Sequence, residues 1–93
     1  MAFKDWAGFL NTLGEEFSDV VAKAGVDDVS GQDCYSVIAD TLGTKEITPD
    51  TLRSMHPDQI ADITSAMNRI FKTKRVRASH VTKAIKNTLW HWS

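Results

Sequence analysis

The side chains that most often do chemistry are few and widely spaced in this chain of 93 residues. Its three histidines are His56, His80 and His91. On a helix, His80 and His91 would lie about three turns apart, roughly 16 Å at a rise of about 1.5 Å per residue, which is too far to share one metal ion. The histidine spacing therefore predicts no zinc site.

The single cysteine, Cys34, is a weak candidate for a nucleophile. No histidine adjoins it, so nothing evident would lower the pKa of its thiol, and it shares an apolar stripe with Val37 and Ile38. We interpret it as a small core residue, with a reactive thiol as the alternative. Glu15 and Glu16 are typical of solvated charges, and neither a glycine-rich phosphate loop nor a nucleophile elbow occurs. We predict a protein that is not an enzyme and needs no metal or cofactor.

Charge is the stronger signal, because the two halves of the chain carry opposite charge. Residues 1–50 hold three lysines against ten acids, a net charge of −7, whereas residues 51–93 hold eight bases against two acids, a net charge of +6. This polarity favours an acidic partner, a nucleic acid or head-to-tail self-association, with neutralisation inside the molecule as the alternative. The basic residues predicted to bind a partner are Arg69, Lys72, Lys74, Arg75, Arg77, Lys83 and Lys86.

Two kinds of partner fit this basic segment. It could follow a phosphate backbone while the last helix approached a groove, which makes a small nucleic-acid-binding protein the alternative. The acidic half would repel a polyanion, however, and the link from Lys72 to Ala78 is longer than the turn of a helix-turn-helix motif. We therefore predict a protein partner with a helical or acidic surface, contacted also through Phe9 and Trp90 as aromatic anchors at the edge or outside of their helices.

Helices must position these side chains, because apolar residues recur at spacings of three and four along most of the chain. The sequence predicts four main helices, over residues 3–24, 31–42, 57–71 and 79–91, and a short one that starts at residue 49. No alternation of period two is long enough to propose a sheet. We expect residues 1–93 to form a single compact all-α domain, with its helices in an orthogonal or bundle-like array.

Local signals set the expected ends of these helices. Gly25 and Gly43 are suited to carboxyl-terminal caps, and Ser30 stands three residues before Asp33 in a capping arrangement. Three further starts carry a capping hydroxyl or a first-turn proline: Thr48–Pro49, His56–Pro57 and Ser79. Gly14 lies inside the first predicted helix, where glycine costs up to about 1 kcal/mol relative to alanine, so we expect either a closely packed neighbour or a loose helix.

The helical spacing also predicts a core. The residues expected to meet there are Trp6, Leu13, Phe17, Val37, Ile38, Ile60, Ile63, Met67, Ile70 and Ile85. In the last helix, Trp92 is expected to be buried and Trp90 exposed, since the helical wheel places them on opposite faces. No signal peptide and no apolar run near the roughly 20 residues needed to cross a bilayer occur, so we expect a cytoplasmic protein that makes no membrane contact.

One stretch resembles a known family. The run Ile47-Thr48-Pro49-Asp50-Thr51-Leu52, followed by Asp58-Gln59-Ile60 and by Ile63 to Asn68, is similar to small tail assembly chaperones of long-tailed bacteriophages, over residues 47–71. The resemblance implies a mostly helical protein in the cytoplasm of a bacterial host. It also implies a protein that binds the tape measure protein, keeps its long apolar helices from aggregating and recruits tail tube subunits. The basic last helix departs from the family pattern, in which this region is more variable.

Overall fold

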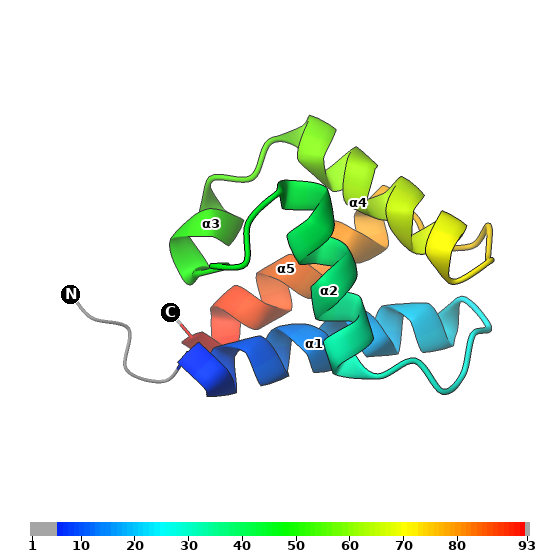
Figure 1. The fold of residues 1–93 in the computed structure, drawn as a ribbon, viewed down its shortest axis with the longest axis horizontal. Helices are drawn as coiled ribbons and strands as arrows, with labels where there is room; N and C mark the ends of the chain where they lie inside the picture. Colours follow the sequence, from blue (N-terminus) through cyan, green and yellow to red (C-terminus); the bar gives the residue numbers. More distant parts are fainter. Residues whose placement is uncertain (1–5, 93) are drawn as a thin grey trace.

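Five helices make up the fold in the computed structural model, which describes residues 6–92 (Figure 1). Their bounds are α1 Trp6–Lys23, α2 Gly31–Leu42, α3 Pro49–Arg53, α4 Pro57–Ile70 and α5 Ala78–Trp92. No strand occurs within residues 6–92. The prediction of a compact all-α array with four main helices and one short helix is confirmed. Residues 3–5, with which the first predicted helix begins, lie outside the described residues.

The capping signals act as the sequence indicates. The Ser30 hydroxyl accepts a hydrogen bond from the backbone N–H of Asp33 at 3.1 Å, and Thr48 accepts one from Thr51 at 3.3 Å. Gly25 and Gly43 adopt left-handed conformations, with φ of 92° and 71°, which reverse the chain at the ends of α1 and α2. These caps fix the ends of the two connectors that join α2 to α1 and to α3.

The start of α5 differs from the prediction by one residue. The helix begins at Ala78 rather than at Ser79, so Ser79 lies inside the first turn instead of capping it. The backbone N–H of Arg77 donates to Nδ1 of His80 at 3.4 Å, so the side chain three residues into the helix bonds back to the residue before it. A histidine can therefore take the place of the usual acid or amide in this arrangement.

The helices pack around α1 and α4. Helix α1 packs on α2 and α5, α4 also packs on α2 and α5, and α3 packs against α5. Helix α2 crosses α1 where Gly14 meets Gly31: a Cβ atom added to Gly14 would lie 2.7 Å from the backbone oxygen of Gly31. The absence of side chains at both positions lets the two backbones approach closely; of the two alternatives, a close neighbour or a loose helix, the structure has the close neighbour, which accounts for the glycine inside α1.

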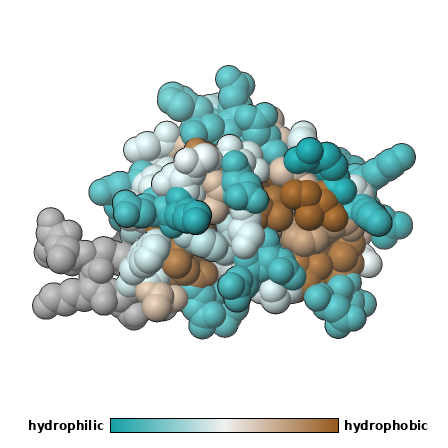
Figure 2. All heavy atoms as spheres, in the orientation of Figure 1, coloured by the Kyte–Doolittle hydropathy of each residue, from teal (hydrophilic) through white to brown (hydrophobic). Residues whose placement is uncertain are grey.

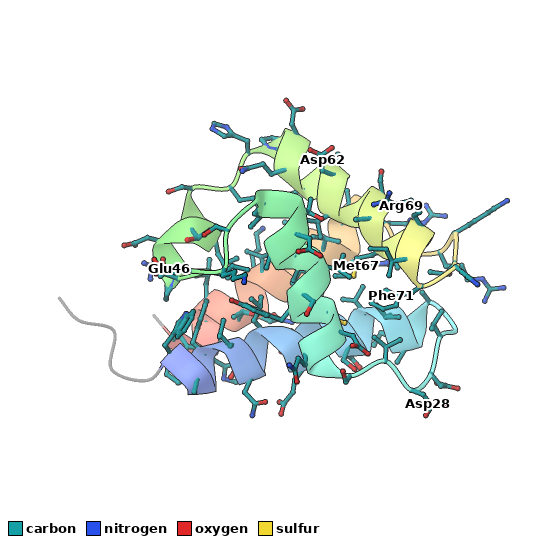
Figure 3. All side chains as sticks on the ribbon, in the orientation of Figure 1. Asp28, Glu46, Asp62, Met67, Arg69 and Phe71 are labelled. Carbon is teal, nitrogen blue, oxygen red and sulfur yellow. The ribbon has the colours of Figure 1, made fainter. Side chains whose placement is uncertain are left out.

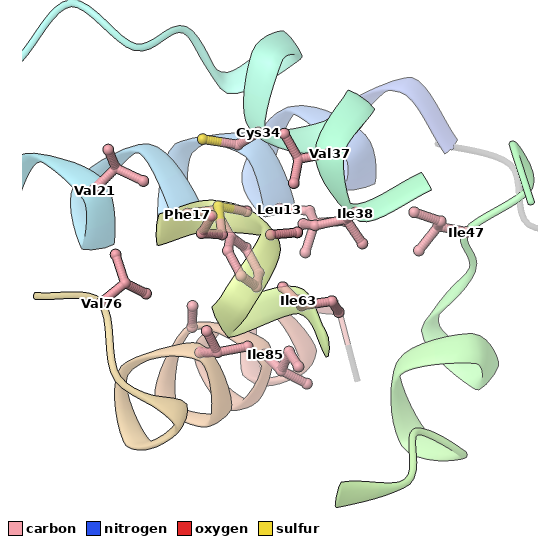
Figure 4. Packing of buried hydrophobic residues seen from close by; sticks show 14 of the residues in the cluster. Leu13, Phe17, Val21, Cys34, Val37, Ile38, Ile47, Ile63, Val76 and Ile85 are labelled. Atoms are coloured by element: carbon pink, nitrogen blue, oxygen red, sulfur yellow. The ribbon is translucent and has the colours of Figure 1, made fainter. Parts of the chain in front are cut away.

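The core lies where the helices meet, and most of the predicted residues are in it (Figure 4). The buried members of the predicted set are Leu13, Phe17, Val37, Ile38, Ile63, Met67 and Ile85. Val76, in the connector before α5, is also buried. The core thus joins residues from all five helices and from the connectors, among them Ala24, Ile47 and Val76, into a single cluster.

Four predicted side-chain positions in and near the core are wrong or only partly right. The buried stripe of α1 follows Phe9, Leu13, Phe17 and Val21, so Phe9 is fully buried rather than partly exposed. Trp6 falls at the edge of that stripe, is 39% exposed, and donates its indole N–H to the carbonyl of Ile47 at 2.8 Å. The buried face of α1 is therefore the one that carries apolar residues spaced four apart.

The other two corrections concern α4. Ile60 is only half-buried, and Ile70 is 47% exposed. Ile70 lies on the last turn of α4, which projects past α2 in Figure 1, so the neighbouring helix that covers Ile63 and Met67 does not reach it. A helical wheel gives the direction of a side chain but not the length over which a neighbour covers it.

Candidate functional site

The seven basic residues predicted to bind a partner are all exposed: Arg69, Lys72, Lys74, Arg75, Arg77, Lys83 and Lys86. Within residues 6–92, the direct ion pairs are Asp19–Lys23 and Asp50–Arg53, and each lies inside one helix. None of the seven therefore forms a direct ion pair with a described acidic residue. Their charge remains available to a partner.

The connector between α4 and α5, residues 71–77, is held in place by Asn68. The amide nitrogen of Asn68 donates to the carbonyl of Val76 at 2.9 Å, and the N–H of Val76 donates to the amide oxygen of Asn68 at 3.0 Å. The Thr73 hydroxyl also donates to the carbonyl of Ala24 at 3.3 Å, which ties the connector to the end of α1. The basic side chains of this connector are therefore carried by an anchored backbone. The sequence gives no sign of the Asn68 contacts.

Backbone conformation at Lys72 turns the chain after α4. Lys72 has a φ of 55°, and the N–H of Thr73 donates to the carbonyl of Asn68 at 3.0 Å. This places Lys72 and Lys74 beyond the carboxyl end of α4, where the helix dipole favours positive charge. Arg75 reaches the turn after α1, since a Cβ atom added to Gly25 would lie 3.8 Å from its Nη1 atom.

An apolar patch lies beside this basic connector. We define it as Ile70, Phe71 and Val26: Ile70 is 47% exposed, and the other two are partly buried against the core. Figure 2 shows apolar surface at the end of the molecule where α1 and α4 stop, and Figure 3 places Phe71 there, between these helices. Apolar side chains with charged residues on both sides are typical of protein–protein contact sites.

A second exposed surface is the outer face of α5, which we define as Lys83, Lys86 and Trp90. These three residues lie on one stripe, opposite Val81 and Ile85, which are buried. Trp90 is 81% exposed, which confirms the predicted phase of the helix. Residues 78–92 contain no acid, so this face carries positive charge and one large aromatic ring.

The structure also corrects the predictions for Trp92 and Phe9. Trp92 is partly buried rather than fully buried, and its ring packs edge-on against Phe9, with centroids 6.3 Å apart and an interplanar angle of 87°. Phe9 is fully enclosed by α1, α5 and their neighbours, so it cannot contact a partner and is removed from the candidate partner-binding residues. The spacing of four from Phe9 to Leu13, Phe17 and Val21 was the sequence signal for its burial.

Acidic side chains stand beside two of the basic residues. Lys83 lines a groove between α1 and α5 together with Glu16 and Asp19, and Asn87 in the same groove approaches Glu16, with Nδ2 and Oε2 3.5 Å apart. Arg69 lines a groove between α2 and α4 together with Asp62. Lys83 and Arg69 therefore have carboxylates as near neighbours, although neither forms a direct ion pair with them; in the first groove Asp19 pairs with Lys23 instead.

The remaining candidate, Cys34, is a core residue. Its side chain is fully buried, and burial, helped by the nearby Asp33 charge, raises the pKa of the thiol to about 12. At neutral pH the thiol is protonated and therefore a poor nucleophile or metal ligand. Within residues 6–92, no group of three or more histidine, cysteine or acidic side chains is arranged to hold a metal ion.

None of the helices within residues 6–92 combines the length and the apolar character needed to span a bilayer. The surfaces that distinguish this chain are thus the outer face of α5 and the end of the molecule that carries the apolar patch. We compared the chain with protein-family models, with curated proteins and with solved structures, and none of them matches it.

Proposed function

We propose that this chain is a non-enzymatic protein-binding module that docks another protein on the outer face of α5. The observation that supports this most strongly is the exposure of Trp90, 81%, on a stripe with Lys83 and Lys86. Tryptophan is strongly enriched among the residues that dominate binding energy at protein interfaces. An aromatic ring that follows two lysine side chains along one stripe provides both an apolar anchor and electrostatic orientation.

The chemistry of this face defines the partner. Because α5 carries two outward lysines and no acid, the partner surface is expected to be acidic around an apolar pocket or groove that receives the indole ring. A helix with one apolar and one acidic face satisfies both requirements. The resemblance to tail assembly chaperones gives the partner class to test first, a long helical protein of the tape-measure type in the cytoplasm of a bacterial host.

Nucleic acid is the second candidate partner, and the surroundings of the lysines disfavour it. Lys83 shares its groove with Glu16 and with the Asp19–Lys23 ion pair, so a phosphate that approached Lys83 from this side would also meet the carboxylate of Glu16. A partner protein can place its own cation beside Glu16, whereas a polyanion cannot. We therefore treat nucleic-acid binding as an outcome to be distinguished by experiment.

The test is affinity capture from a lysate of the native host with the unmodified chain and two variants. Trp90→Ala removes the proposed anchor, and His91→Ala is the matched control, because His91 is the adjacent exposed residue and lies outside the Lys83–Lys86–Trp90 stripe. For a captured protein, Trp90→Ala should lower the affinity by about 30-fold, which corresponds to about 2 kcal/mol for an interface hot spot. His91→Ala should leave the affinity within about twofold.

Nuclease treatment separates the two classes of partner. A protein partner should remain bound after nuclease digestion, and its binding should depend on Trp90. Recovery of nucleic acid alone, with an affinity that falls by about 0.9 log unit per tenfold rise in salt for each phosphate contacted, would overturn the proposal. A protein partner that binds Trp90→Ala as tightly as the unmodified chain would also overturn the assignment to this face.

A further inference from the structure

The apolar patch lies between two groups of opposite charge. Val26 is followed directly by Asp27 and Asp28, which are exposed and form an acidic rim. Phe71 is followed directly by Lys72, with Lys74 two residues later, and these exposed lysines form a basic rim. Figure 2 shows hydrophilic side chains on both sides of the apolar surface, and Figure 3 places Asp28 on the far side of the patch from Arg69 and the end of α4.

We propose that this surface binds the same surface of a second copy of the chain, to form a homodimer with two-fold symmetry. In such an isologous interface each residue contacts the symmetry-related patch, so a surface with opposite charges on its two sides is complementary to itself. A two-fold axis that passes between the rims places the acidic rim of each copy against the basic rim of the other. Ile70 and Phe71 of the two copies then cover one another.

Both rims are anchored before any partner arrives. On the basic side, the Asn68 amide holds Val76, and Thr73 bonds to the carbonyl of Ala24 at 3.3 Å. On the acidic side, the Ser18 hydroxyl donates to the carbonyl of Val29 at 2.7 Å. Because these backbones are already fixed, dimer formation orders few segments, which lowers the entropic cost of association.

This surface is separate from the outer face of α5, so the dimer does not depend on the proposed function. The patch contains few side chains, so the expected interface falls below the size of a standard stable complex and the dimer should be weak. Exposed charges are screened within about 10 Å at 0.1 M salt and within about 3 Å at 1 M. Raising the salt from 0.05 M to 1 M should therefore increase the dimer dissociation constant by at least about tenfold.

Sedimentation velocity over a range of protein concentrations measures this dissociation constant. The acidic-rim variant is Asp27→Lys with Asp28→Asn, and the basic-rim variant is Lys72→Asn with Lys74→Glu. Asparagine is chosen at 28 and 72 because these residues have φ of 67° and 55°, a conformation that asparagine tolerates well. Controls with similar charge changes on exposed residues of α2 and its following loop are Asp40→Lys and Lys45→Glu.

The opposite charges of the two rims predict different dissociation constants for each rim variant alone, for their mixture and for the controls. Each rim variant alone places like charges against each other, so its dimer dissociation constant should rise at least about tenfold at low salt. An equimolar mixture of the two variants pairs a copy with two basic rims and a copy with two acidic rims, and should associate within about threefold of the unmodified chain. The controls should leave the dissociation constant within about twofold.

Ile70→Asp tests the apolar part of the same surface. Ile70 is half-exposed, so this variant should fold, as checked by circular dichroism, and should lose the dimer. A monomer mass for the unmodified chain at low salt and millimolar concentration would overturn the proposal and leave the patch to another protein. A dimer that is insensitive to the rim variants, or a mixture that fails to recover it, would overturn the proposed pairing.

Discussion

The crossing of α1 and α2 provides a prediction in which two physical effects oppose each other in sign. Gly14→Ala removes a glycine from the middle of a helix, which by helix propensity alone should stabilise the fold by up to about 1 kcal/mol. In the structure, however, the added Cβ atom would lie 2.7 Å from the backbone oxygen and 2.8 Å from the carbonyl carbon of Gly31. Neither atom can move away by a side-chain rotation, because both belong to the backbone.

The magnitude follows from the displacement that relieves this contact. Ordinary van der Waals contact begins near 3.4 Å, so α1 and α2 must separate by about 0.7 Å. A gap of 0.5–1 Å removes about a quarter to a half of the dispersion energy of the contacts that it opens, and overpacking of this kind typically costs about 1–3 kcal/mol. After a propensity gain of about 1 kcal/mol is subtracted, Gly14→Ala should destabilise the protein by up to about 2 kcal/mol.

Urea unfolding followed by circular dichroism measures the change in the free energy of unfolding. Asn11→Ala is the control, because Asn11 lies on the exposed face of α1 and its replacement raises helix propensity without adding atoms at the crossing. We expect the control to stabilise the protein by about 0.5 kcal/mol or less and Gly14→Ala to destabilise it. A Gly14→Ala variant more stable than the unmodified chain would refute the close backbone crossing.

Three further predictions concern single side chains. Cys34 should react with disulfide reagents at pH 8 far more slowly in the folded than in the unfolded protein, since a thiol with a pKa of about 12 is ionised to only about one part in 10⁴ at that pH. The thiol of the unfolded chain has a pKa near 9, so the stabilising contribution of the buried neutral thiol is complete below pH 9. Between pH 9 and 12 the free energy of unfolding should fall by about 1.4 kcal/mol per pH unit. Cys34→Ala should remove this part of the pH dependence. Asn68→Ala should cost about 1–3 kcal/mol in urea unfolding, because it removes both hydrogen bonds to Val76, and a loss below about 0.5 kcal/mol would contradict their structural role. Trp92→Ala should cost about 3 kcal/mol and Trp90→Ala less than about 1, and equal losses in thermal unfolding would contradict the phase of α5.

Features that depend on neighbours in the sequence were predictable. Ser30, Thr48 and Pro57 mark helix starts because their hydroxyl or fixed φ acts on the next few residues, and the structure places helices there. The helical wheel of α5 likewise predicted that Trp90 is exposed, because the residues on the opposite, inward face of this helix are small or apolar. Local physical chemistry was sufficient for the element order and for the outer face of α5.

Features that depend on the length and reach of other helices were not predictable in this way. Phe9 was expected to contact a partner but is buried, because α1 packs on α2 and α5. Ile70 was expected in the core but is exposed, because the end of α4 projects past the helix that would cover it. The Asn68 contacts with Val76 join residues eight apart across a turn whose path the sequence does not specify. Consequently the apolar patch, with its two charged rims, appears only in three dimensions.

The central claim, that the outer face of α5 binds another protein, is tested most directly by photocrosslinking from this face in the native host. A photoreactive amino acid is placed at Lys86, which lies on the stripe with Trp90 and leaves the proposed anchor intact, and at Ser36 on the exposed side of α2 as the control. We expect position 86 to give a crosslinked species that resists nuclease and is digested by protease, and we expect position 36 not to give it. Crosslinks from position 86 to nucleic acid alone, or equal yields of the same protein adduct from both positions, would contradict the claim.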